Sequence, residues 1–210
     1  MEHFLNINMP RVKLEPELKK AISGLSHKEK DKLLNRLIAK DPALVARLNF
    51  ELIESPNGVT KEERREEVEK DLLHSLEVNQ SQYHSPGYLL LDLRHLSGEI
   101  NRHVRTTKDK YGDIYLNFLM LNTAFRLHGN QLRNASYHSA KTFNDYVIKR
   151  ALRLLNQLSK LHEDHVLDFE EPMKELGNHI GDCDTSMKAC LLYTSPSPRD
   201  ATLSRMPSSA

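Results

Sequence analysis

Residues 89–125 carry the strongest pattern in the chain and read LLLDLRHLSGEINRHVRTTKDKYGDIYLNFLMLNTAF. Apolar residues recur there at every third or fourth position, first over 89–104 and then over 111–125. This spacing places them on one face of an α-helix. The stretch therefore predicts two long amphipathic helices, one after the other.

The helical pattern continues on both sides of this stretch. Two capping boxes, Ser26 with Glu29 and Thr60 with Glu63, each mark the start of a leucine-containing helix, and the first of these helices is predicted over residues 27–40. No segment shows the strand alternation that hairpin turns would bound. The sequence therefore predicts an all-α protein of about seven to eight helices.

Two helical architectures are compatible with these helices. The capping boxes at Ser26 and Thr60 lie 34 residues apart, which is a typical period of helix-pair repeats. The leucine pairs that follow them, which begin at Leu33 and Leu72, lie 39 residues apart. Both a helical bundle and a short helix-pair, solenoid-like array therefore remain open.

The predicted boundary between two regions is the segment 79–87, NQSQYHSPG. It has no apolar periodicity and ends in Ser-Pro-Gly, which disfavours the continuation of a helix. We expect a region of shorter helices over 1–78, a linker over 79–87 and a region of longer helices over 88–189. Within the last region, Gly129 is predicted to end a helix, with a polar connection over 130–139.

The end of the chain, residues 190–210, reads CLLYTSPSPRDATLSRMPSSA. This segment resembles one reading frame of a transposase-type sequencing-library adapter. The resemblance implies that the segment is not native protein, that it is a disordered tail and that the natural carboxyl terminus is missing. Because residues 1–8 lack periodicity, both Met1 and Met9 remain open as the initiator.

Composition gives a neutral chain once this segment is set aside. The full chain has 30 Lys and Arg residues against 29 Asp and Glu residues. Without Arg199, Arg205 and Asp200 each sum becomes 28. Cys183 is then the only cysteine, which excludes an internal disulfide and fits a reducing compartment. No run of about 18 apolar residues and no secretory signal is present, so we expect a cytoplasmic protein without membrane contact.

A second resemblance concerns residues 25–54, LSHKEKDKLLNRLIAKDPALVARLNFELIE. This tract resembles the opening of small uncharacterised helical proteins of bacteria, in which a capped leucine helix precedes a Lys-Asp-Pro turn and a second helix. The resemblance implies a bacterial, cytoplasmic, all-helical protein. It implies no activity and no functional residues.

Four potential metal ligands recur along one predicted helix. Asp92, His95, Glu99 and His103 lie three or four residues apart, so their side chains follow one side of the helix and offer imidazole and carboxylate to a divalent metal. Each of the last three also directly precedes an apolar stripe residue. They therefore equally fit a half-exposed border of the buried face, without a cofactor.

Basic residues gather in the second half of the chain, among acids such as Asp109 and Asp113. A phosphate-binding patch is predicted if the long helices lie together. Its members are Arg94, Arg102, Arg105, Lys108, Lys110, Arg126, Arg150 and Arg153.

Catalytic signatures do not occur in this sequence. We find no phosphate-binding glycine loop, nucleophile elbow, metalloprotease helix or paired cysteines. Because amphipathic helices are abundant, the sequence favours a non-catalytic interaction or scaffold domain that binds another protein or itself. The alternatives are a nucleic-acid-associated regulator that uses the basic residues, and a metal-dependent enzyme around His95, Glu99 and His103.

Overall fold

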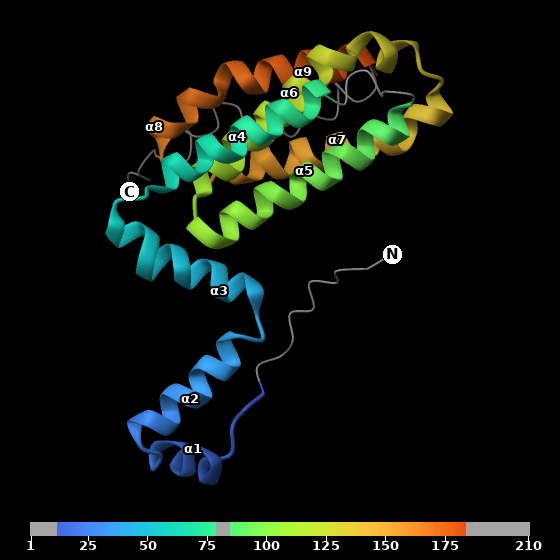
Figure 1. Cartoon of the computed structure of the whole chain (residues 1–210). Helices are drawn as coiled ribbons and strands as arrows, with labels where there is room; N and C mark the ends of the chain where they lie inside the picture. Colours follow the sequence, from blue (N-terminus) through green and yellow to red (C-terminus); the bar gives the residue numbers. More distant parts are fainter. Residues whose placement is uncertain (1–11, 79–84, 184–210) are drawn as a thin grey trace, which may run out of the picture. The chain divides into compact units, whose positions relative to one another are not determined.

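The computed structural model describes residues 12–78 and 85–183. Within these ranges the regular elements are all helical, and eight of the helices have eight or more residues. The all-α prediction is therefore confirmed. The chain divides between Ala46 and Arg47 into two compact units, unit 1 and unit 2 (Figure 1).

Unit 1 contains α1 (Pro16–Ser23), α2 (His27–Ile38) and the first part of α3 (Pro42–Asn49). The capping box that begins α2 is present: Ser26 Oγ accepts from the Glu29 N–H at 3.3 Å, and Glu29 Oε2 accepts from the Ser26 N–H at 2.9 Å. None of the residues described in this unit, 12–46, is buried. Local caps, and not a core, therefore define these helices.

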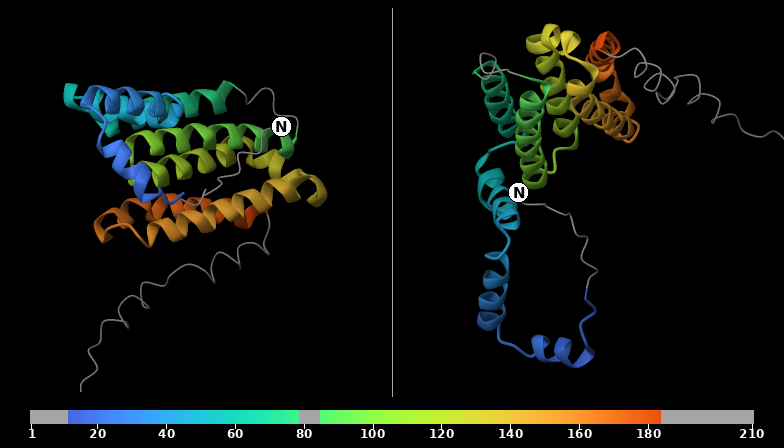
Figure 2. Two further views of the ribbon diagram at one scale, coloured as in Figure 1. Left: turned by 90° about the horizontal axis from the view of Figure 1, so that it is seen from below. Right: turned by 90° about the vertical axis from the view of Figure 1, so that its right-hand side faces the viewer.

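Unit 2 is a helical bundle. The elements before its first long helix are the end of α3, a π-helical turn η1 (Phe50–Glu54) and η2 (Ser55–Asn57). Five long helices then alternate in direction along the bundle, and Figures 1 and 2 show them lying alongside one another. They are α4 (Lys61–Val78), α5 (Pro86–Thr107), α6 (Lys110–Asn134), α7 (Tyr137–Leu158) and α9 (Glu170–Cys183), with α8 (Glu163–Val166) and η4 (Leu167–Phe169) before the last.

Helix α6 lies at the centre of unit 2, in contact with α4, α5, α7 and α9. Every residue of α6 from Tyr111 to Phe125 is buried or half-buried, which fits the lack of a single apolar stripe on this helix. Ile114, Leu116, Met120 and Leu121 are each at most 1% exposed. The other four helices contribute one apolar face each to this core. Their largest contributions include Leu72, Leu76, Leu93, Ile100, Phe143, Leu154 and Leu176.

Two predicted limits differ from the structure. The division of the chain lies at 46/47 and not at 79–87, because Leu72 and Leu76 of α4 are buried in the same core as α5 and α6. Residues 79–84 of the predicted linker lie outside the described residues. Helix α6 also continues past Gly129 to Asn134, with only a short connection before α7.

None of the helices in the described ranges combines the length and the apolarity that a membrane crossing needs.

Candidate interaction surface

The four predicted metal ligands do not converge. His95 is 77% exposed and lies 4.0 Å from Glu99, which also pairs with Arg102. His103 is buried on another side of α5, where its Nε2 lies 3.4 Å from Asp109 Oδ2. Over residues 12–78 and 85–183, no group of three or more His, Cys, Asp or Glu side chains is arranged to hold a metal.

Asp92, the remaining member, is electrostatically coupled to His128 of α6. Burial raises the pKa of Asp92, and the charges of His128 and His95 act in the opposite direction. Burial lowers the pKa of His128, which favours the neutral imidazole. His128 was not among the predicted site residues because it comes from a different helix. Asp92 therefore belongs to the contact between α5 and α6.

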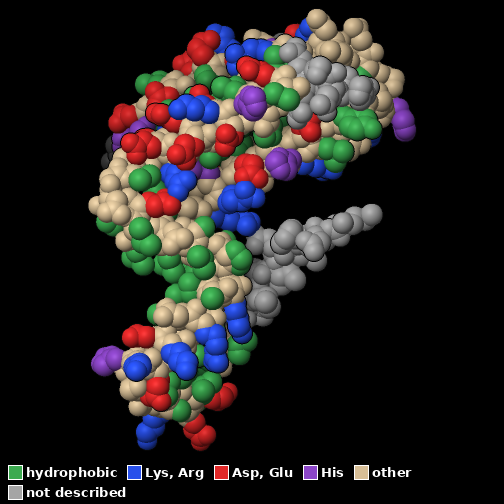
Figure 3. Space-filling view, in the orientation of Figure 1, with side chains coloured by type: hydrophobic (Ala, Val, Ile, Leu, Met, Phe, Trp, Pro, Cys, Tyr) green, Lys and Arg blue, Asp and Glu red, His purple; other side chains and the backbone are tan. Residues whose placement is uncertain are grey.

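Half of the predicted basic patch is engaged within the bundle. Arg102 pairs with Glu99, and Arg126 Nε lies 3.4 Å from Glu175 Oε1. Figure 3 shows acidic side chains interleaved with basic ones over the face of unit 2 in view. The members of the patch that are exposed and form no ion pair with the described residues are Arg94, Arg105, Lys108 and Lys110.

The other two predicted arginines, Arg150 and Arg153, belong to a polar network between α6 and α7. Arg153 Nη2 donates to Asp113 Oδ2 at 2.9 Å, and Arg150 Nε donates to Asn117 Oδ1 at 2.7 Å. Gln157 Nε2 donates to the same Asp113 oxygen at 2.6 Å. Burial lowers the pKa of Arg150. These arginines hold α7 against α6. Packing of the bundle therefore explains both side chains, and a bound nucleic acid is not needed to explain them.

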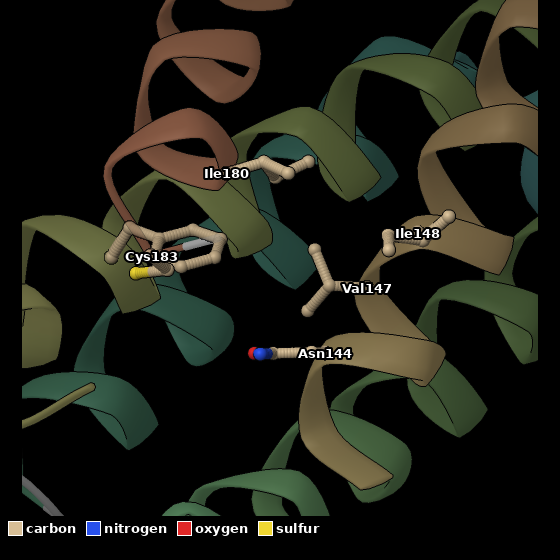
Figure 4. A pocket seen from close by; sticks show the side chains of 6 residues that line it. Asn144, Val147, Ile148, Ile180 and Cys183 are labelled. Carbon is tan, nitrogen blue, oxygen red and sulfur yellow. The ribbon is translucent and has the colours of Figure 1, made fainter. Parts of the chain in front are cut away.

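A small pocket lies between α6, α7 and α9. Figure 4 shows Ile180 and Cys183 of α9 opposite Asn144, Val147 and Ile148 of α7, and Phe125 of α6 also lines the space. It has room for about one water molecule and is mostly apolar. It is therefore too small for a substrate of metabolite size.

An exposed apolar stripe runs along α2 in unit 1. We define the α2 face as Leu33, Leu34, Leu37 and Ile38, which share one side of this helix. Leu34 is 55% exposed and Leu37 is 53% exposed, while the other two are half-buried. The opposite side carries basic residues, and Figure 3 shows Lys and Arg side chains along this part of the chain. By helical spacing, the basic residues on the side opposite the α2 face are Lys28, Lys32 and Arg36.

Several other apolar side chains are at least as exposed as Leu34 and Leu37. In unit 2 they include Leu52 and Ile53 of η1, Leu91 of α5 and Leu167 of η4. Exposed apolar side chains of this kind are normal on a globular domain. The α2 face differs from these residues of unit 2 because its helix, like α1 and α3, has no buried residue.

The described residues present exposed apolar surface for contact, whereas their potential catalytic and metal-binding groups are paired or separated. The buried carboxylates Asp109 and Asp113 are engaged by arginines, and the predicted metal ligands are separated.

Comparison of the chain with protein-family models, with curated proteins and with solved structures gave no match in any of the three.

Proposed function

We propose that this protein is a non-catalytic interaction module, in which unit 2 is a stable helical carrier and unit 1 binds a protein partner through the α2 face. The observation that carries this proposal is the exposure of Leu34 and Leu37 on a helix that buries none of its residues. Covering an apolar stripe that the described part of unit 1 leaves exposed is favourable, because it removes apolar surface from water.

The length of α2 supports the same proposal. Helices shorter than about 12–15 residues are marginal in water unless tertiary packing supports them. α2 has 12 residues. Its capping box contributes about 1 kcal/mol, which favours the helix without burying the leucines. Covering the exposed halves of Leu34 and Leu37 would add on the order of 1 kcal/mol each.

Unit 2 does not need this face for its own stability. Its core is continuous over the five long helices, and its buried aromatic side chains pack on one another. Phe125 and Phe143 lie 5.9 Å apart in an edge arrangement, and Phe118 and Phe169 lie 5.9 Å apart in a stacked one. We therefore assign a structural role to unit 2 and a binding role to unit 1.

We propose the cytoplasm as the location. The support is the cysteine content: Cys183 is the one cysteine outside the adapter-like segment, and a disulfide within the native chain would need two. A fluorescent fusion would test this location, and a signal confined to the cell envelope would contradict it.

Affinity capture from cells that naturally carry the gene tests the binding role. The bait is the full chain as wild type, as the Leu34→Asp/Leu37→Asp variant and as the control Lys28→Ala/Arg36→Ala, which alters the opposite side of the same helix. We expect wild type and control to retain a common protein, a second copy of this chain included, and the aspartate variant to lose at least about 90% of it. Equal retention by all three baits, or retention of nothing specific, would refute the proposal.

A further inference from the structure

We infer that the partner of the α2 face is the α2 face of a second copy of this chain, with the two helices antiparallel. This inference rests on the proposed interaction function and names its partner. It is argued from the symmetry of the α2 face and from the charges at the two ends of that face.

The α2 face is self-complementary about a two-fold axis. Leu34 and Leu37 are equally distant from the midpoint between residues 35 and 36. An antiparallel pair of helices with its axis at that midpoint therefore places Leu34 against Leu37 of the partner subunit, and Leu37 against Leu34 of the partner subunit. The same surface is used by both copies, as a closed two-fold dimer requires. Leu33 and Ile38 then border the two leucine layers.

Charges at the ends of the face favour the antiparallel direction. Lys30 lies on the same side of α2, one turn before Leu34, and Asp41 follows shortly after the last residue of the helix. Antiparallel pairing brings Lys30 toward Asp41 of the partner subunit. Parallel pairing would instead place Lys30 beside Lys30 of the partner subunit, which is repulsive. Antiparallel helices also align their dipoles favourably.

Both charged groups have capacity for such a contact. Lys30 Nζ donates one hydrogen bond, to Ser23 O at 2.9 Å, and an ammonium has three donors. Asp41 Oδ1 accepts from the N–H groups of Ala43 and Leu44 at 3.0 and 3.1 Å. A carboxylate offers about four acceptor positions, so these caps leave room for a lysine.

Sedimentation of the full chain over a range of concentrations tests the dimer. We expect a monomer–dimer equilibrium in the wild type, a dissociation constant raised more than about 100-fold by Leu34→Asp/Leu37→Asp, and a change of less than about threefold in Lys28→Ala/Arg36→Ala. Thermal melting of all three proteins checks that the bundle is intact. A wild-type chain that stays monomeric up to about 100 micromolar would overturn the inference.

Disulfide trapping tests the antiparallel register. In a Cys183→Ser/Cys190→Ser background, a mixture of Leu34→Cys and Leu37→Cys chains should form mixed disulfides several-fold faster than either chain alone, because only the mixed pair lies within disulfide reach. Faster trapping of Leu34→Cys with itself would indicate parallel pairing and overturn the inference. If the chain is monomeric but the capture experiment retains a different protein through the α2 face, the second-copy inference fails while the proposed function stands.

Discussion

Arg65 of α4 donates from Nε to Asp109 Oδ2 over 2.9 Å and thereby ties α4 to the turn between α5 and α6. The Asp109 side chain is fully buried. Its other oxygen accepts the Gly112 N–H at 2.9 Å, which caps α6, and His103 Nε2 of α5 lies 3.4 Å from Oδ2. The Arg65 guanidinium also lies 4.9 Å from the centroid of the Tyr111 ring. One carboxylate thus joins three helices of the bundle.

Asp109→Asn should lower the free energy of unfolding by about 2–3 kcal/mol. The asparagine can still cap α6, but the largely buried Arg65 loses its charge partner, and breaking one side of such a pair is costly. Urea unfolding measures the loss. The control is Glu62→Gln, which removes an exposed partner of the same arginine, 3.3 Å away, and should change stability by less than about 1 kcal/mol. Equal effects of the two variants would contradict this account.

Stability should also depend on pH through Asp109. Burial acts to raise the pKa of this carboxyl, but the hydrogen bond with His103, the Gly112 N–H and the charge of Arg65 outweigh it, so the pKa lies below its ordinary value. A lowered folded-state pKa gives stability that is present above the unfolded-state value of about 3.9 and is lost as pH falls through the folded-state value. The stability difference between wild type and Asp109→Asn should therefore be constant near neutral pH and narrow below about pH 4. A difference that widens in acid would show the opposite sign of shift.

Two glycines should respond oppositely to alanine. At Gly112 a Cβ would lie 2.1 Å from Asp109 Oδ2, so Gly112→Ala must displace the capping carboxylate and should cost about 1–3 kcal/mol. At Gly98, on the exposed side of α5, a Cβ would meet nothing within 4 Å, so Gly98→Ala should stabilise by about 0.5–1 kcal/mol through helix propensity. Thermal melting of both variants decides the matter. A melting temperature for Gly112→Ala at or above that of wild type would show that the carboxylate is not held there.

Zinc should not bind at the predicted row on α5. His103 faces Asp109 inside the bundle while His95 is exposed, so at most His95 and Glu99 act together. Calorimetric titration of the wild type and of His95→Ala should give the same absence of specific heat. A saturable heat that disappears in His95→Ala would restore the metal hypothesis.

The adapter-like segment 190–210 lies outside the described residues, and its origin remains a prediction. Sequencing native DNA through the codon of Ala189 should show a reading frame that departs from the printed one at residue 190. Native DNA that encodes Cys190 and the residues after it would refute the prediction. The chain would then contain a second native cysteine.

Local interactions made much of the helical structure predictable. Ser26 and Glu29 form their capping box, and Thr60 and Glu63 do the same, with N–H to oxygen distances of 2.9 and 3.1 Å. Both depend on groups three residues apart, whose geometry the helix itself sets. The apolar spacing of α5 was equally informative, since Leu93 and Ile100 are fully buried. Periodicity identifies which side of a helix avoids water, whatever covers it.

The sequence by itself determined that this chain is helical, where several of its helices begin and, for helices such as α2 and α5, which side is apolar. Only the tertiary structure decided that His103 faces Asp109 and that Arg150 and Arg153 serve the α6–α7 contact. It also decided that Leu34 and Leu37 of the α2 face are more than half exposed. The physical reason is distance along the chain. Arg65 and Asp109 are 44 residues apart, and Arg153 and Asp113 are 40 apart, so no local spacing encodes their meeting. Capping and periodicity act within a turn or two of helix, whereas the burial and pairing of charges depend on how whole helices pack.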